Sequence, residues 1–343
     1  MRKLLNTLFV TSPDSYLSRD GENLLVLIDG KEKLRLPIHT LEGVVCFGYS
    51  GASPALMSLC AKKGVGLSFH NEYGKFLARV SGEVQGNVLL RKKQYKVSEN
   101  EEESIKIARN CIQAKVLNCK SVLQRAIRDH SDVINISNIE EVTVHLSNSL
   151  NQTEKVNFID SLRGVEGDAA KCYFSVFDEL ILKQKEDFYM KSRNKRPPTD
   201  FVNALLSFFY TLLAHDVQSA LETVGLDPYV GFLHQIRPGR PSLALDLMEE
   251  LRPVLADRMA LSLINRQQIK KKGFSIKENG AVLMDDETRK EVLQSWHKRK
   301  QEEIIHPFLQ EKIQLGLLPY AQAMLLARHL RGDLDGYPAF IWK

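Results

Sequence analysis

The sequence predicts an α+β fold, with an N-terminal β-rich domain followed by a larger all-α domain. Short apolar runs separated by Asp-Gly and Tyr-Gly pairs fill residues 1–85, which is typical of strands joined by tight turns. Apolar residues then recur at helical spacing almost to the end of the chain. A length of 343 residues also suits two domains better than one. We therefore place the β-rich domain at 1–85, a linker at 86–104 and the helical domain at 105–343.

The N-terminal domain is expected to contain six strands and one helix. The expected strands are Leu4–Thr11, Leu24–Asp29, Lys31–Ile38, Val44–Phe47, Val65–Phe69 and Lys75–Val80. The helix is expected over Ser53–Lys63, because Ser53 can cap it, Pro54 suits its first turn and Gly64 can end it. No glycine-rich phosphate-binding loop follows a strand. The domain is therefore interpreted as a scaffold or a dimer surface.

The second part of the chain is expected to be helical. Residues 86–104 change from basic residues to three consecutive glutamates, which indicates a linker or a helix start. Helices are expected at 104–130, 151–181, 200–224 and 317–330. The 200–224 segment is apolar around most of its circumference and precedes Gly225, so it predicts a central helix with a glycine C-cap. The basic segment 267–284 contains two glycines and suits a mobile loop or a hairpin.

Composition limits the class of protein. No apolar run approaches the length of a membrane span, about 18 residues. The N-terminal residues form only a broken apolar segment, which we interpret as a strand and not a signal peptide. The five cysteines are an odd number without a Cys-x-x-Cys pair. This favours reduced thiols and a cytoplasmic location over a zinc site or a disulfide scaffold.

Positive charge is clustered, although the net charge is only +5. The clusters are Arg91/Lys92/Lys93/Lys96, Lys191/Arg193/Lys195/Arg196, Lys270/Lys271/Lys272 and Lys298/Arg299/Lys300. Any one of them alone is better explained by a solvated surface than by a binding site. Together they favour a nucleic acid partner, because clustered Lys and Arg side chains neutralise phosphates.

The segment Gly231–Pro253 carries the first candidate site. His234 precedes a Pro-Gly-Arg-Pro turn, and Ser242 is expected to cap a helix that runs to Arg252. Asp246 and Glu249 are three residues apart on that helix, so their carboxylates would be neighbours. An imidazole and carboxylates together suit Mg²⁺ or Mn²⁺. The alternative is a solvated acidic helix face beside an unrelated histidine.

Glu166 is the second candidate, in the segment RGVEGDAAKCYF. Gly164 and Gly167 flank it and would let backbone or ligand approach closely. A carboxylate held against a packed surface must be paired or bind metal, because an isolated buried charge is very costly. The alternative is a surface glutamate near a helix start, where negative charge is favourable.

Three separated motifs give the chain a family resemblance. RGVEGDAAKCYF, NALLSFFYTLL (Asn203–Leu213) and GFLHQIRPGRPSLALDLMEELRP occur in the order and with the kind of spacing found in the CRISPR-associated integrase family, the Cas-one proteins. The chain resembles that family over nearly its whole length. Its closing segment, Gly316–Lys343, is similar to the type I-C branch.

The resemblance implies a β-rich dimerisation domain and a helical catalytic domain. It implies that Glu166, His234 and Glu249 hold Mg²⁺ or Mn²⁺, with Asp246 as a fourth candidate ligand. The implied activity is that of a metal-dependent DNA endonuclease and strand transferase, which inserts short duplex DNA into a CRISPR array by 3′-hydroxyl attack on a phosphodiester. The implied partners are double-stranded DNA, a second copy of the chain and a Cas-two dimer.

Basic residues near the motifs are the candidates for phosphate contacts. They are Lys191, Arg193, Lys195, Arg196, Arg237, Arg240 and Arg252. Three other functions stay open from the residues alone. These are a metal-dependent DNA repair nuclease without an integration role, a non-catalytic DNA-binding scaffold, and a helical interaction protein, which the basic clusters disfavour.

Overall fold

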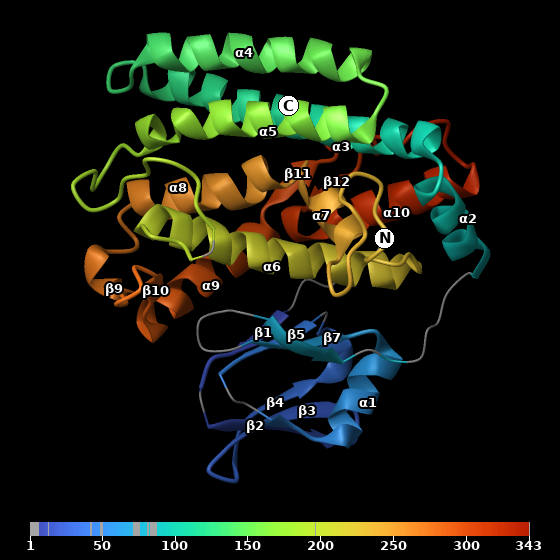
Figure 1. Ribbon diagram of the computed structural model, residues 1–343. Helices are drawn as coiled ribbons and strands as arrows, with labels where there is room; N and C mark the ends of the chain where they lie inside the picture. Colours follow the sequence, from blue (N-terminus) through green and yellow to red (C-terminus); the bar gives the residue numbers. More distant parts are fainter. Residues whose placement is uncertain are drawn as a thin grey trace. The chain divides into compact units, whose positions relative to one another are not determined.

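The computed structural model describes residues 7–12, 14–41, 43–48, 51–70, 76–80, 82, 88–195 and 197–342. The chain divides into two compact units, and the α+β fold class is confirmed (Figure 1). The first unit comprises Met1–Gly86, Met284–Glu303 and Gln314–Leu317, and the second comprises Asn87–Leu283, Ile304–Ile313 and Leu318–Lys343. A helical segment from late in the chain is therefore part of the first unit, which differs from the expected division at residue 85.

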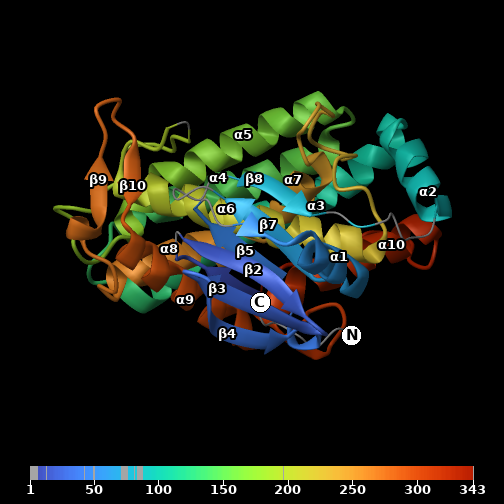
Figure 2. The ribbon, with the colours of Figure 1, turned by 90° about the horizontal axis from the view of Figure 1, so that it is seen from below.

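Within its described residues, the first unit has two four-stranded sheets. One has the order β1-β5-β7-β8, with the bounds β1 Thr7–Val10, β5 Gly43–Phe47, β7 Gly66–His70 and β8 Phe76–Val80. The other has the order β4-β3-β2-β6, with the bounds β2 Ser15–Asp20, β3 Asn23–Ile28, β4 Lys31–Pro37 and β6 Gly51–Ala52. Figure 2 shows β2, β3 and β4 side by side. The Asp29-Gly30 pair joins β3 to β4 with both residues at positive φ, as a tight hairpin turn requires.

Helix α1 (Pro54–Lys63) forms as its end residues predict. The Ser53 hydroxyl accepts a hydrogen bond from the Leu56 N–H at 3.2 Å, and Gly64 ends the helix at φ 66°. Its buried face joins a core with Leu17, Leu24 and Val44. Strand β2 was not expected. Residues 4–6 and Lys75, which belong to two of the expected strands, lie outside the described residues.

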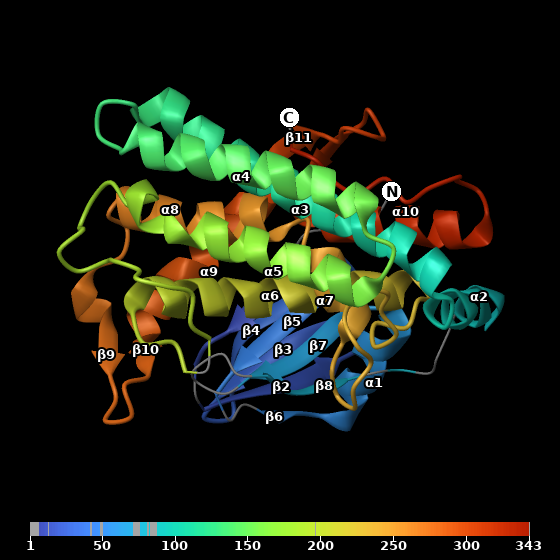
Figure 3. The ribbon, with the colours of Figure 1, turned by 45° about the horizontal axis from the view of Figure 1, so that its top comes forward.

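The second unit is mainly helical. Its helices are α2 Val88–Ser98, α3 Glu101–His130, α4 Ile136–Lys155, α5 Ile159–Ser175, α6 Phe201–Val224, α7 Ser242–Met248, α8 Arg258–Asn265 and α10 Leu318–Arg331. Helix α9, Asp286–Gln301, lies in the first unit. A π-helix, η3, covers Arg252–Asp257, and short 3₁₀ helices cover Ile38–Thr40, Phe177–Leu180, Lys271–Gly273 and Leu315–Leu317. Helices α3, α4 and α5 lie side by side (Figure 3).

Several expected elements have different bounds. The segment expected as a linker, 86–104, forms α2 and the first turn of α3 over its described part. The expected helix 151–181 is interrupted, because α4 ends at Lys155 and α5 begins at Ile159. Strands β9 (Phe274–Ile276) and β10 (Val282–Met284) form the hairpin that was one of two expectations for 267–284. Strands β11 (Glu303–Ile305) and β12 (Lys312–Gln314) pair as well, so the later part of the chain is not purely helical.

Helix α6 is the central helix of the second unit, as its apolar circumference predicts. The Asp200 carboxylate caps it by accepting the Asn203 N–H at 2.7 Å, and Gly225 closes it at φ 87°. It packs against α7, α8, α10 and η3. All five cysteines are free thiols. Within the described ranges no helix is both long and apolar enough to cross a membrane.

Candidate active site

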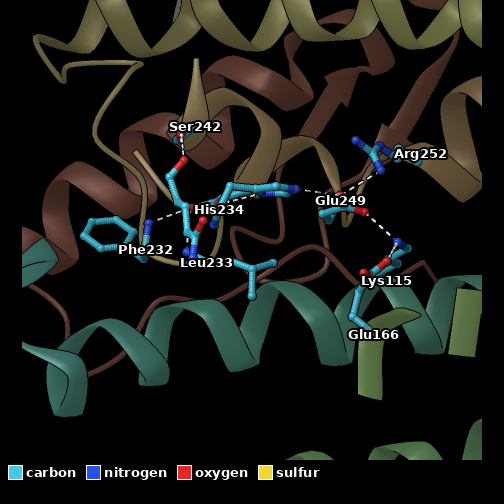
Figure 4. A network of polar contacts seen from close by, with 10 residues as sticks. Lys115, Glu166, Phe232, Leu233, His234, Ser242, Glu249 and Arg252 are labelled. Carbon is cyan, nitrogen blue, oxygen red and sulfur yellow. Dashed lines mark hydrogen bonds and ion pairs between the residues drawn. The ribbon is translucent and has the colours of Figure 1, made fainter. Parts of the chain in front are cut away.

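The three predicted ligands are on separate elements of the second unit. Glu166 lies in the middle of α5, His234 on the loop before α7, and Glu249 directly after α7. Lys115 of α3 connects two of them, since its Nζ lies 2.7 Å from Glu249 Oε2 and also donates to Glu166 Oε1. His234 Nε2 is 3.9 Å from Glu249 Oε1. Figure 4 shows these side chains pointing toward one another.

Asp246 fixes the loop that carries His234. Its Oδ2 accepts the backbone N–H groups of Phe232 and Leu233 at 2.6 and 2.9 Å. Its Oδ1 accepts the backbone N–H of His234 at 2.9 Å and lies 2.7 Å from Nδ1 of the same residue. A carboxylate can only accept, so this contact assigns the imidazole proton to Nδ1. In the neutral ring, Nε2 then has a free lone pair on the side of Glu249.

Gly231 is required by the close approach of this loop to α7. A Cβ at Gly231 would lie 2.6 Å from Asp246 Oδ2 and 2.8 Å from the Ser242 carbonyl carbon. At Gly164 and Gly167 a Cβ would meet nothing within 4 Å. No other described part of the protein therefore packs closely against Gly164 or Gly167. The close approach expected at these two glycines is not explained by packing within the described residues.

We expect Gly231→Ala to destabilise the protein by about 1–3 kcal/mol, as overpacking does, and to displace the His234 loop. Thermal denaturation followed by circular dichroism measures the first effect. Gly164→Ala is the matched control, because it fills open space within α5 and is expected to stabilise by up to about 1 kcal/mol. An unchanged melting temperature for Gly231→Ala would contradict the contacts described for this loop.

The expected N-cap at Ser242 is wrong, and the alternative of a solvated acidic helix face is excluded. Ser242 is the first residue of α7 and donates its hydroxyl to the Gln235 carbonyl at 3.0 Å, so it closes the preceding turn instead of capping the helix. Helix α7 ends at Met248, short of Arg252. Asp246, Glu249 and Glu250 are 1%, 2% and 0% exposed. A buried carboxylate needs hydrogen-bond donors or cations as partners. Asp246, Glu249 and Glu250 each have a different set of such partners.

Glu249 is an ionised carboxylate in a buried place. Its Oε1 is 2.7 Å from Arg252 Nη1, and its Oε2 faces Lys115. Burial alone raises the pKa of Glu249, but the charges of Arg252 and Lys115 outweigh burial and lower it to about 2. Burial likewise lowers the pKa of Lys115, but Glu249 and Glu166 raise it above its usual range. The cluster therefore pairs two cations, Lys115 and Arg252, with the carboxylates of Glu249 and Glu166.

A pocket of about 490 Å³ opens beside this cluster. Its lining includes Lys115, Glu166, Tyr173, Phe174, Lys191, Arg193, Lys195, Tyr210, Arg252 and Asp257. Four of the predicted phosphate contacts thus face one pocket. Two of the other candidates, Arg237 and Arg240, lie on the loop after His234. The third, Arg196, lies outside the described residues.

Tyr210 organises two of these cations. The guanidinium carbons of Arg193 and Arg252 lie 5.2 and 4.9 Å from the centre of its ring, within cation–π range. Its hydroxyl donates to Asp257 Oδ1 at 2.7 Å. Burial raises the pKa of Asp257 to about 6, against the hydrogen bond from Tyr210 and the charge of Arg193. The ring of Tyr210, fixed by its hydrogen bond to Asp257, therefore holds both guanidinium groups at the pocket.

Sequence reasoning missed Lys115, Tyr210 and Asp257. A signal existed for Lys115, which occupies a position in the buried stripe of α3 between Cys111 and Cys119 at helical spacing. A lysine in such a stripe needs a buried anion. Tyr210 lies in α6 and Asp257 in η3, both within largely apolar stretches of sequence. Nothing in the spacing of these stretches indicated a functional role for either residue.

Glu166, His234 and Glu249 offer donor atoms that suit a hard divalent cation. In this structure the three side chains do not surround a single point where an ion could bind. Two carboxylates and one imidazole nitrogen are donors that Mg²⁺ and Mn²⁺ accept. Among the described residues, no three His, Cys, Asp or Glu side chains are close enough to hold an ion as they stand. The Lys115 ammonium lies between Glu166 and Glu249 instead.

Comparison with known proteins gives consistent matches. A family model described as "CRISPR associated protein Cas1" matches residues 8–298. CRISPR-associated endonuclease Cas1 1 of Chlorobaculum tepidum is 49% identical, and CRISPR-associated endonuclease Cas1 2 of Rhodospirillum rubrum is 51% identical, each over 100% of both chains. A casposase bound to integration product has a similar fold, with TM-score 0.85, 21% identity and coverage of 98% of this chain and 94% of that one. A Cas1 protein from Thermotoga maritima gives TM-score 0.82, 23% identity and coverage of 95% and 97%.

Proposed function

The chain belongs to the Cas1 family of CRISPR-associated proteins, and on that premise we propose that it is an integrase as well as an endonuclease. It would insert short duplex DNA into a CRISPR array. The observation that carries the proposal is the convergence of Glu166, His234 and Glu249, from three separate elements, beside a basic pocket. The type I-C assignment stays a prediction, because the relatives' names give the family alone.

Cas1 nucleases are metal-dependent in general. We propose that Glu166, His234 and Glu249 hold Mg²⁺ or Mn²⁺ in this chain, because these donors suit hard cations and Glu249 is ionised at neutral pH. When bound, the ion would polarise a phosphoryl oxygen and stabilise the attacking and leaving oxygens. Asp246 would keep the His234 proton on Nδ1 and act as a positioning residue instead of a fourth ligand.

The basic pocket supports a DNA substrate. Arg252 and Arg193 are held on the Tyr210 ring, and Lys191 and Lys195 line the same pocket. We propose that these four side chains bind phosphates of the reacting strand. Arg196, Arg237 and Arg240 stay predictions for contacts further along the duplex.

The same groups suit both cleavage and joining of strands. If water attacks the phosphodiester, the strand is cut; if a DNA 3′-hydroxyl attacks, strands are joined. A casposase bound to integration product shares the fold. So does part of a chain in a Cas6-RT-Cas1–Cas2 complex, with TM-score 0.81 and 22% identity over 98% of this chain and 36% of that one. We propose joining as the main reaction, a homodimer formed through the β-rich unit, and a Cas-two dimer as partner.

A strand-transfer assay tests this function. A labelled duplex with a free 3′-hydroxyl is incubated with a repeat-containing target and Mn²⁺ or Mg²⁺, with and without the Cas-two partner. Integration predicts metal-dependent products that contain both DNAs, and chelation should remove them. Cleavage without joining, under conditions that cut the target, would favour the alternative of a DNA repair nuclease.

We expect duplex binding to weaken steeply with salt, because each phosphate contact releases a counterion. The logarithm of affinity should fall against the logarithm of salt concentration by about 0.9 per contact. Lys195→Met should therefore make the slope shallower by about 0.9, as measured by fluorescence anisotropy. Lys31→Met, at an exposed position in β4, is the control and should leave the slope unchanged. A flat plot for the wild-type protein would count against DNA as the substrate.

A further inference from the structure

Lys115 is an unusual lysine, because its side chain is only 9% exposed. It lies on the buried face of α3, where its helical neighbours Cys111 and Cys119 are packed in the core. Lysine is almost never fully buried unless its charge is paired. The ammonium must therefore be held by specific anions.

Those anions are two of the proposed metal ligands. The Nζ of Lys115 lies 2.7 Å from Glu249 Oε2 and donates to Glu166 Oε1, so one ammonium bridges carboxylates from two elements (Figure 4). A divalent ion bound to both carboxylates would have to occupy the same space, at about 2.0–2.1 Å from each oxygen for an ion the size of Mg²⁺. Two cations cannot share that position, because like charges at such separations repel strongly.

We infer that Lys115 is an exchangeable counter-ion, whose ammonium holds the place of the divalent cation in the free protein and leaves when the ion binds. The inference rests on the proposed function of Glu166 and Glu249 as metal ligands. Arg252 stays on Glu249 Oε1 in either state, since it contacts the oxygen that Lys115 does not. Only one of the two buried cations therefore needs to move.

The pocket gives the displaced ammonium a destination. Lys115 and Glu166 both line the 490 Å³ space that Lys195 and Arg193 also face. The cluster in the free protein is balanced, with Lys115 and Arg252 against Glu166 and Glu249. A bound divalent ion leaves an excess of two positive charges in that space. A phosphodiester is the ligand that such an excess attracts, so metal uptake prepares the pocket for DNA.

Isothermal titration with Mn²⁺ tests the exchange directly. Removing the competing charge in Lys115→Met should tighten Mn²⁺ binding at least about tenfold, which corresponds to ~1.4 kcal/mol. Lys120→Met is the matched control, since this lysine is on the same helix and bonds a neutral Ser147 hydroxyl; its affinity should equal the wild-type value. Equal or weaker binding by Lys115→Met would overturn the inference while leaving the metal site standing. Absence of Mn²⁺ binding by the wild-type protein and by Lys115→Met would overturn both.

Thermal denaturation shows whether the Lys115→Met variant is folded. Without metal, Lys115→Met should melt below the wild-type protein, because Glu166 and Glu249 lose their shared partner. Mn²⁺ should then raise its melting temperature by more than it raises that of the wild type. Lys115→Gln, which keeps a hydrogen-bond donor but no charge, should behave in the same way. Its melting temperature without metal should be below that of the wild type, and Mn²⁺ should raise it by more. A smaller Mn²⁺-induced rise in both variants would mean that the ammonium assists the ion, contrary to the inference.

Discussion

Replacing His234 or Glu166 with alanine is expected to reduce metal-dependent DNA cleavage and strand transfer at least about 1,000-fold, or ~4 kcal/mol in activation free energy. Each substitution removes one of the three donors proposed to hold the ion. The fold should survive, because the side chains of His234 and Glu166 are 19% and 23% exposed and are not packed in the core. Gel assays with end-labelled DNA measure activity, and circular dichroism measures the melting temperature.

A second histidine–carboxylate pair gives a matched control. His145 of α4 lies 2.7 Å from Asp168 of α5, and both side chains are largely exposed. His145→Ala should keep wild-type cleavage and strand transfer, because the pair is outside the cluster around Glu249. If His234→Ala or Glu166→Ala retained wild-type activity after contaminating nucleases were removed, the assignment of both residues would be discarded.

Elements with strong local signals could be predicted from the sequence. The ends of α1 follow from Ser53, Pro54 and Gly64, and the C-terminal end of α6 follows from Gly225. Capping depends on residues within one turn, so a linear pattern contains the necessary information. The family motifs supplied Glu166, His234 and Glu249, which local spacing alone would not have connected, since they lie on three elements.

Roles that depend on tertiary contacts could not be predicted. The alternative of a solvated acidic face for Asp246 and Glu249 depended on one regular helix that continues to Arg252. The chain instead turns after Met248 and enters a π-helix, which directs each acid to a different partner. Glu250, for example, accepts hydrogen bonds from the Tyr337 hydroxyl and the Phe340 N–H at 2.5 and 2.7 Å.

The pKa values of Glu249 and Glu250 depend on the groups packed around each side chain and cannot be inferred from their positions in the sequence. Burial raises the pKa of Glu250 to about 7, despite three hydrogen bonds that favour its charged form. Glu249, its neighbour in sequence, has a pKa lowered to about 2 because Arg252 and Lys115 face it. Two adjacent glutamates thus have opposite shifts, and only the packed partners distinguish them.

Asp246→Asn is expected to lower Mn²⁺ affinity and strand transfer by about 100-fold, the upper end of the range for residues that orient a metal-binding histidine. An amide has one acceptor and one donor group, whereas Asp246 faces three backbone N–H groups and the Nδ1 proton. If the amide donates to Nδ1, the imidazole proton must move to Nε2, which removes the lone pair that the ion needs. Mn²⁺ titration and the strand-transfer assay measure both losses. Asp178→Asn, which affects a carboxylate that accepts the Met190 N–H elsewhere in the unit, is the control.

A double-mutant cycle separates positioning by Asp246 from direct ligation. If Asp246 acts only through His234, Asp246→Asn should cause no further loss of the residual Mn²⁺ affinity in a His234→Ala background, because the ring it orients is gone. If Asp246 were itself a ligand, the two losses would add. The contacts favour the first result, since both oxygens of Asp246 are already used by the loop from Phe232 to His234. Thermal denaturation should show Asp246→Ala less stable than Asp246→Asn, because alanine leaves every one of those buried donors without an acceptor.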